Sequence, residues 1–182
     1  MSTREVTWSD VEAYEAELRR ELPRFEICYK DESPLQRVIG KLVWLFNRSY
    51  MTNYTTVMFG RVYFPNRKWA ERLGPRPVLL TLRHEAVHLR DMKRFPLIFQ
   101  LTYLFVFPTV FSMRAIWELR AYRESIRAQG ELYGSVQQRD IEFIVERFTG
   151  ADYLFMFPFA GVIRRDLERV ALEAGFPVKS EA

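Results

Sequence analysis

The spacing of apolar and polar positions along the chain predicts mostly helices. Two stretches with helical spacing follow capping sequences, Ser-Asp-Val-Glu at 9–12 and Ser-Pro-Leu-Gln at 33–36, and the second has proline at the first helical position. The helices predicted in this way cover residues 10–22, 34–46, 66–73, 77–93, 114–129, 136–150 and 161–174. Gly130 lies just past the predicted end of one helix, and Ser-Val-Gln-Gln at 135–138 is interpreted as the cap of the next.

Two other stretches have the composition of β-strands. Residues 25–29 alternate enough for a short strand, and residues 54–64 are rich in Thr, Val, Phe and Tyr. Gly60 in the middle of the second stretch predicts either one bulged strand or two short strands. The sequence has no internal repeat, low-complexity tract or linker. It therefore predicts a single domain, 1–182, of the α+β class, mainly helical, with a small sheet before the 77–93 helix.

Composition and charge reduce the number of function classes that the sequence allows. The chain has 48% hydrophobic and 27% charged residues, which is typical of a globular protein with one core. Its net charge is +4 without a basic tract, so we expect no nucleic-acid partner. Cys28 is the only cysteine, which excludes an intrachain disulfide and a Cys-based zinc finger. The first residues lack the apolar run of a secretory signal, so we expect a cytoplasmic protein.

The helix predicted at 77–93 carries a motif typical of metal-dependent hydrolases. Residues 84–88 read His-Glu-Ala-Val-His, the H-E-x-x-H pattern. Side chains four residues apart share one helix face, so His84 and His88 can reach a single ion. Glu85 is offset from both histidines and can accept a proton from a bound water without occupying a coordination position.

The alternative is that two surface histidines have this spacing by accident. The chain has two histidines, and random placement with Glu after the first would give the pattern about once in a thousand. The neighbouring Leu, Val and Ala residues predict a largely buried helix, where two imidazoles without a shared partner are costly. The motif therefore indicates a metal site, and ligands of these types favour zinc.

The surrounding segments resemble a known family. Residues 79–91, Leu-Leu-Thr-Leu-Arg-His-Glu-Ala-Val-His-Leu-Arg-Asp, resemble the active-site helix of zincin metallopeptidases. Residues 117–122, Trp-Glu-Leu-Arg-Ala-Tyr, are similar to the E-x-x-A-D element of the gluzincin branch, especially the membrane-bound prenyl-protein and heat-shock endopeptidases. The resemblance implies Glu118 as the third zinc ligand and Ala121 as the small residue that allows close helix packing. Tyr122 replaces the usual Asp.

Several other residues are candidates for supporting roles. Asp91 shares the histidine face but lies about 10 Å along the helix axis from the first histidine. That position favours orienting a ligand over binding the ion. Tyr122 and Tyr133 are candidates for the oxyanion donor that peptide hydrolysis requires. Glu124 is the rival third ligand.

Residues 95–113 contain no charged side chain and are long enough to raise the question of a membrane span. Two prolines and several polar residues interrupt the stretch, and a single crossing would separate His88 from Glu118. Two interpretations remain open. One is a buried helix that breaks at Pro108, and the other is a hairpin that dips into a membrane surface.

The leading functional hypothesis is a metallopeptidase with one zinc ion, Glu85 as general base, a peptide or protein substrate and peripheral membrane contact through 95–113. The resemblance also implies that a strand at 57–64 pairs with the extended substrate, although an ordinary core strand is an equal alternative. A second hypothesis is a non-catalytic zinc-binding domain for protein interaction, in one version at a membrane surface. A third is a helical module that binds a membrane or a partner, with a coincidental motif.

Overall fold

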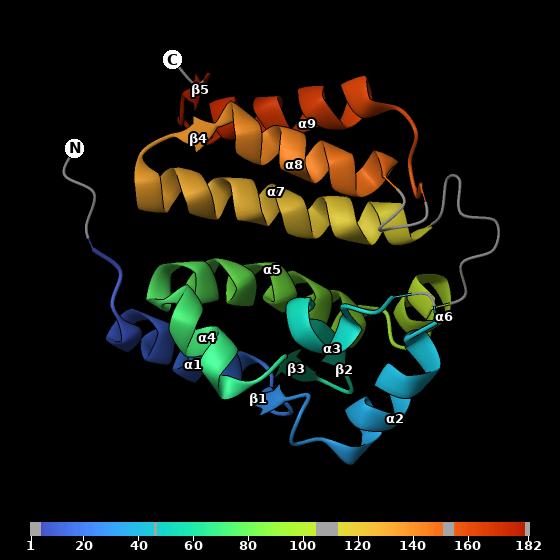
Figure 1. The fold of residues 1–182 in the computed structure, drawn as a ribbon. Helices are drawn as coiled ribbons and strands as arrows, with labels where there is room; N and C mark the ends of the chain where they lie inside the picture. The colour runs from blue at the N-terminus through green and yellow to red at the C-terminus, as the bar shows by residue number, and fades with distance from the viewer. Residues whose placement is uncertain (1–4, 46, 105–112, 151–154, 181–182) are drawn as a thin grey trace. The chain divides into compact units, whose positions relative to one another are not determined.

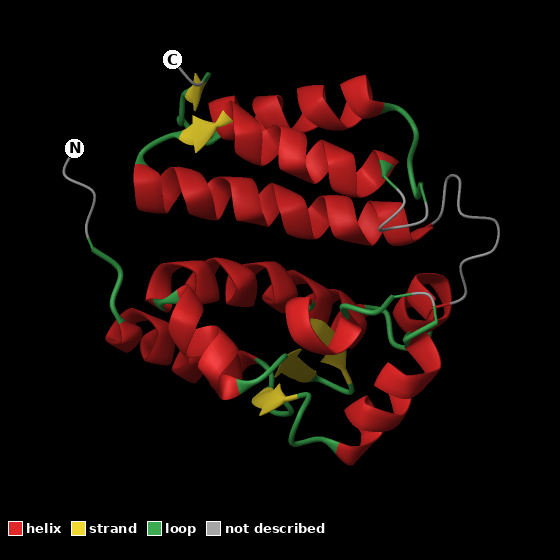
Figure 2. Cartoon of the chain, in the orientation of Figure 1, coloured by secondary structure: helices red, strands yellow, loops and turns green. Residues whose placement is uncertain are grey.

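The computed structural model describes residues 5–45, 47–104, 113–150 and 155–180 (Figure 1). The chain divides into two compact units, which we call the N-terminal unit (Val6–Leu89) and the C-terminal unit (mainly Arg90–Ala182). The boundary falls inside helix α5 (Pro75–Arg94), so this helix begins in one unit and ends in the other. Helices predominate and the sheets are small, which confirms the predicted mainly helical α+β class (Figure 2).

The N-terminal unit contains a three-stranded sheet that precedes α5 in the sequence, as predicted. Its strands are β1 (Glu26–Tyr29), β2 (Thr56–Met58) and β3 (Arg61–Phe64), in the order β1-β3-β2. The central strand β3 is parallel to β1 and antiparallel to β2, and its last three side chains are buried. The helices of this unit are α1 (Trp8–Glu21), α2 (Pro34–Val43), α3 (Tyr50–Asn53), α4 (Arg67–Leu73) and most of α5.

The 54–64 stretch forms two short strands rather than one bulged strand. Phe59 and Gly60 connect β2 to β3, and both have positive φ angles, 54° and 84°. Two central residues in this conformation match the right-handed twist of the strands that they join, and glycine adopts it without steric cost. The turn therefore reverses the chain at Gly60, which decides between the two predicted alternatives.

Polar side chains fix where two of the helices begin. The N-cap of α1 is Thr7, two residues before the predicted cap Ser9, and the carboxylate of Asp10 accepts a hydrogen bond from the Thr7 backbone N–H at 2.8 Å. Helix α4 is capped as its sequence predicts. The Asn66 side chain accepts a hydrogen bond from the backbone N–H of Trp69 at 2.8 Å, and Gly74 follows the helix with a φ of 82°.

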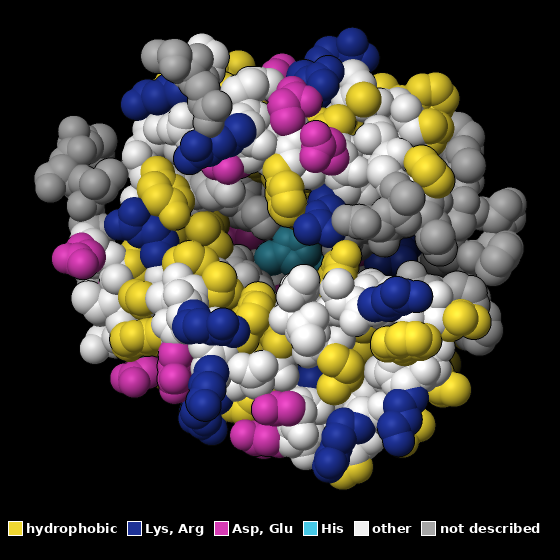
Figure 3. All heavy atoms as spheres, in the orientation of Figure 1, with side chains coloured by type: hydrophobic (Ala, Val, Ile, Leu, Met, Phe, Trp, Pro, Cys, Tyr) yellow, Lys and Arg dark blue, Asp and Glu magenta, His cyan; other side chains and the backbone are white. Residues whose placement is uncertain are grey.

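The outer surface of α2 is unusual for a helix of a globular unit. Figure 3 shows hydrophobic side chains interleaved with Lys and Arg over the region where Figure 1 places α2. The exposed apolar residues of α2 and its C-terminal continuation are Leu35, Val38, Leu42, Trp44 and Leu45. An amphipathic helix normally turns such residues toward the core.

The C-terminal unit is a helical assembly with a two-stranded sheet at one end. Its helices after α5 are α6 (Ile98–Leu104), α7 (Met113–Tyr133), α8 (Gln138–Thr149) and α9 (Ala160–Glu173). Helices α7, α8 and α9 lie side by side (Figure 2) and share a core in which Ile126, Ile141, Phe148 and Leu167 are fully buried. The strands β4 (Val136–Gln137) and β5 (Val178–Lys179) pair in parallel.

The predicted boundary between the fifth and sixth helices is wrong. Helix α7 continues through Gly130 to Tyr133, and Gly134, with a φ of 71°, follows its end. Gly130 is buried inside the helix because the Phe176 ring occupies the space where a Cβ would lie. Ser135 is not a cap, because the next two residues form β4 and the N-cap of α8 is Gln137.

The uncharged stretch 95–113 is only partly described. Its described part contains α6, which begins at Ile98, two residues after Pro96. Pro108, where one interpretation placed a break, lies outside the described residues. In the ranges that the structure describes, no helix has the length and apolar character needed to cross a membrane.

Candidate metal centre

Helix α5 presents both histidines from a largely buried position. The imidazole rings of His84 and His88 lie 5.1 Å apart, centroid to centroid, with their planes at 78°. His88 is buried and His84 is half-buried. The buried apolar side chains of the same helix are Val78, Leu79, Leu82, Ala86 and Leu89. The two histidines therefore lie on adjacent turns of a helix whose position is fixed by packing, as the four-residue spacing predicts.

Glu118 lies in the first half of α7, and its carboxylate is buried. The indole of the preceding residue, Trp117, packs against the rings of Phe95 and Phe99 at centroid distances of 5.7 and 5.5 Å. Its Nε1 donates a hydrogen bond to Oγ1 of Thr102 at 3.0 Å. These contacts within the C-terminal unit fix the rotation of α7 about its axis, so they also fix the direction of Glu118.

The structure brings His84, His88 and Glu118 together. One ligand atom from each residue lies within 4.8 Å of the other two. Tetrahedral zinc with nitrogen and oxygen ligands at about 2.0–2.2 Å requires ligand separations of about 3.3 Å, so small side-chain rotations would close the group around an ion. Two imidazoles and one carboxylate are also a donor set that suits zinc. The group could therefore hold a metal ion.

Glu85 is buried on α5 beside His84, and Lys30 is close enough for the two charges to interact. Lys30 follows β1, and its backbone N–H donates to the Phe64 carbonyl at 2.8 Å, which extends the β1–β3 pairing by one residue. Its ammonium donates to the Tyr50 carbonyl at 2.7 Å and lies 3.7 Å from the centroid of the Tyr50 ring. Burial lowers the pKa of Lys30 to about 7, and the Glu85 carboxylate opposes that change.

Lys30 is the site residue that sequence reasoning missed. Its side chain is fully buried, which is rare for lysine without a partner. The sequence shows only a lysine at the end of a short strand, where an exposed side chain is the ordinary expectation. No local signal places it near Glu85, because the two residues are separated by 55 positions and meet through the fold of the N-terminal unit.

The other predicted site residues lie outside the group of three. Asp91 is buried, and its Oδ1 accepts a hydrogen bond from Nη2 of Arg120 at 2.8 Å. The Tyr122 ring packs against Phe148, with centroids 5.8 Å apart. Tyr133 is the last residue of α7, about 22 Å along the helix from Glu118. Their supporting roles stay predictions, and the structure does not bring Tyr133 near the group.

Strand pairing limits where an extended substrate could add to the sheet. Within the described residues, β3 already has β1 on one side and β2 on the other. The prediction was that the strand at 57–64 pairs with an extended substrate. The second half of that segment is β3, which has no free edge for a peptide among the described strands. The first half forms β2, a strand at the edge of the sheet whose outer side has no described strand beside it. Strand addition in this unit is thus restricted to the edge strands.

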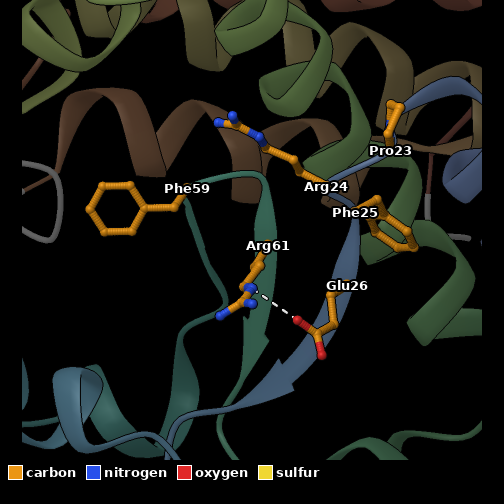
Figure 4. A pocket seen from close by; sticks show the side chains of 6 residues that line it. All are labelled: Pro23, Arg24, Phe25, Glu26, Phe59 and Arg61. Atoms are coloured by element: carbon orange, nitrogen blue, oxygen red, sulfur yellow. Dashed lines mark ion pairs between the residues drawn. The ribbon is translucent and has the colours of Figure 1, made fainter.

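A surface pocket of about 490 Å³ lies in the N-terminal unit, apart from the residues of the metal group. Figure 4 shows its lining, with Arg61 and Glu26 joined by an ion pair of 2.9 Å between Nε and Oε2. The remaining lining residues are Pro23, Arg24, Phe25 and Phe59. The two members of the ion pair are about half-exposed, which is typical of a surface salt bridge of small energetic value.

Comparisons with protein-family models, with curated proteins and with solved structures give no significant match. The resemblance to zincin metallopeptidases therefore rests on the sequence motifs alone.

Proposed function

We propose that the protein is a zinc-dependent metallopeptidase in which His84, His88 and Glu118 hold one ion and Glu85 is the general base. The observation that carries the proposal is the grouping of the three candidate ligand atoms within 4.8 Å of one another. Glu118 follows the two histidines by 30 or more residues of sequence. A chance H-E-x-x-H pattern would give no reason for a third buried ligand to lie beside it.

The residues present suit peptide hydrolysis. A bound zinc ion supplies a Lewis acid that polarises a carbonyl and lowers the pKa of a water molecule toward about 7. Glu85 then accepts the proton of the attacking water and later returns it to the leaving amine. Lys30 lies close enough to Glu85 for their charges to interact, so it is the described cation beside the proposed base.

The proposal includes a cytoplasmic setting with peripheral membrane contact through 95–113. Support comes from the described part of that stretch, where Leu97, Ile98 and Leu101 have exposed side chains. Exposed apolar clusters of this kind mark surfaces that bind a membrane or a partner.

The first experiment is elemental analysis of the purified chain. We expect about one zinc per chain, lost in His84→Ala/His88→Ala. Glu85→Gln removes the base but not a ligand, so it should retain zinc and lose about 10²–10⁴-fold in cleavage rate of an unfolded protein such as casein. A Glu85→Gln variant with normal turnover would contradict the role of Glu85.

The same samples distinguish the alternative of a non-catalytic zinc-binding domain. That alternative gives stoichiometric zinc in the wild-type protein but no cleavage of casein or of a mixed peptide library. Wild-type protein that holds no zinc after metal is added and excess removed would overturn both functions. The motif would then be a coincidence.

A further inference from the structure

The two buried residues of α2 are a polar residue and a glycine. Gln36 is fully buried, and its Oε1 accepts a hydrogen bond from the Tyr50 hydroxyl at 2.6 Å. Gly40 is buried one turn later, and a Cβ at this position would lie 2.6 Å from Sδ of Met51. The inner face of α2 is thus shaped for close contact with α3 rather than for burying leucines.

The opposite face of α2 is apolar and exposed. Leu35, Val38, Leu42 and Leu45 are separated by three, four and three residues, which places them in one row along a helix. Leu42 is 72% exposed and Leu45 is 75% exposed. The apolar side chains of a helix in this orientation are not buried in the core of their own unit. Its apolar row needs another apolar surface.

Cations accompany this row along α2 and beyond its end, while the exposed acidic residues Asp31 and Glu32 precede the helix. Arg37 and Lys41 are exposed on α2, and the guanidinium of Arg48 lies 5.1 Å from the Trp44 ring centroid. Residues 33–70 contain six Lys or Arg and no Asp or Glu. A tryptophan beside cationic side chains at the border of an apolar row is typical of residues at a membrane–water interface.

We propose that α2 lies on anionic lipid bilayers, with its leucine row inserted at the headgroup level and its cations on the lipid phosphates and carboxylates. The excess of cations over 33–70 fits an anionic surface, and Trp44 beside Arg48 at the border of the row favours a lipid headgroup layer over an acidic protein groove. The inference is independent of the metal site.

Vesicle flotation of the full chain tests the proposal. We expect binding to phosphatidylcholine vesicles that contain phosphatidylserine, much weaker binding to pure phosphatidylcholine, and weakening by salt. Leu42→Gln/Leu45→Gln should reduce the partition coefficient about tenfold or more. The matched control is Leu172→Gln, which changes an exposed leucine of α9 and should leave partitioning unchanged. These side chains are exposed, so circular dichroism should show folded variants.

A second pair of variants isolates the charge contribution. Arg37→Gln/Lys41→Gln should weaken binding to the anionic vesicles about tenfold or more, whereas Arg20→Gln/Arg72→Gln removes two exposed cations elsewhere and should have a much smaller effect. The Trp44 emission should shift to the blue on binding, measured as the difference between wild type and Trp44→Phe.

Three outcomes would overturn the proposal. One is no binding to either vesicle. Another is binding that survives both α2 variants but is lost in Leu97→Gln/Leu101→Gln, which would assign membrane contact to the 95–113 stretch alone. The third is a dimer in analytical ultracentrifugation that is abolished by Leu42→Gln/Leu45→Gln in a chain that does not bind vesicles. That result would make the leucine row a self-association surface.

Discussion

Asp91 and Arg120 tie the last turns of α5 to α7 inside the C-terminal unit. The buried Asp91 carboxylate accepts a hydrogen bond of 2.8 Å from the Arg120 guanidinium. Asp91 follows His88 by three residues on α5, and Arg120 follows Glu118 by two residues on α7. The ion pair therefore sets the axial position of the third candidate ligand relative to the end of the H-E-x-x-H helix.

Removing the arginine should be costly because a buried carboxylate would lose a charged partner. We expect Arg120→Leu to lower the free energy of unfolding by about 1–3 kcal/mol at neutral pH, measured by urea denaturation. Adding Asp91→Asn should recover part of the loss, since the charge is then absent. The control is Arg127→Leu on the exposed side of α7, where the ion pair with Glu124 is 4.0 Å long and the expected change is within about 0.5 kcal/mol. Equal losses in both single variants would contradict a special role for the Asp91–Arg120 pair.

Two of the glutamates of α7 provide a matched test of the third ligand. Glu118 belongs to the candidate metal group, whereas Glu124, the alternative raised by the sequence, does not. We expect Glu118→Gln to weaken zinc binding by more than about 100-fold and Glu124→Gln to change it little, in competition with a chromogenic chelator. The opposite order of affinities would assign the ligand to Glu124.

The buried Lys30 should make stability depend on pH. Its pKa is about 7 in the folded chain and about 10.4 when unfolded, so between these values the unfolded state binds the additional proton. The free energy of unfolding should therefore rise with pH in this window, by up to about 1.4 kcal/mol per pH unit. Below pH 7 the cost of burying the cation is fully present.

Lys30→Met should remove that pH-dependent contribution and leave stability at pH 7 equal or higher, because an apolar chain of similar length replaces a buried cation. Urea denaturation at several pH values between 7 and 10 measures both effects. Lys41→Met controls for the loss of an exposed lysine. A parallel pH dependence in wild type and Lys30→Met would show that Lys30 titrates as an exposed group.

Two glycines within helices should respond oppositely to alanine. At Gly130 an added Cβ would overlap the Phe176 ring, whereas at Gly161 in α9 the nearest atom, Nη1 of Arg165, would be 3.9 Å away. We expect Gly130→Ala to destabilise by about 1–3 kcal/mol despite its better helix propensity. Gly161→Ala should be neutral or stabilising by up to about 1 kcal/mol. Thermal unfolding compares the two, and a stabilised Gly130→Ala would mean that Phe176 moves aside easily.

Local signals predicted most of the helices and strands, because caps, turns and helical spacing act over a few residues. The sequence placed α4 between Asn66 and Gly74, and the structure uses both residues for the same purposes. Gly130 misled the prediction for a physical reason. Glycine is required there because the Phe176 ring, 46 residues later in the chain, fills the space that a Cβ would occupy. The residues around position 130 give no indication of that contact.

The part of the candidate site that depends on helical spacing could be predicted from the sequence. Four-residue spacing determines that His84 and His88 share a face, and Glu118, which the family resemblance implied as the third ligand, belongs to the same group in the structure. The burial of Lys30 could not be predicted, because it depends on how β1, β3 and the residues around Tyr50 assemble. The apolar periodicity of α2 similarly indicated a helix but not which of its faces points outward.

Cys28, the only cysteine, lies in β1, where it is paired in register with Tyr63 of β3. Burial raises the pKa of its thiol, helped by the nearby negative charge of Glu26, so little thiolate exists in the folded chain at neutral pH. Cys28 is only half-buried, so a maleimide can reach this one sulfur in the folded chain, and the raised pKa predicts slower capture than in the unfolded chain at the same pH. The difference between the two capture rates measures how strongly the surroundings of β1, two residues from Lys30, suppress the thiolate, without an added label.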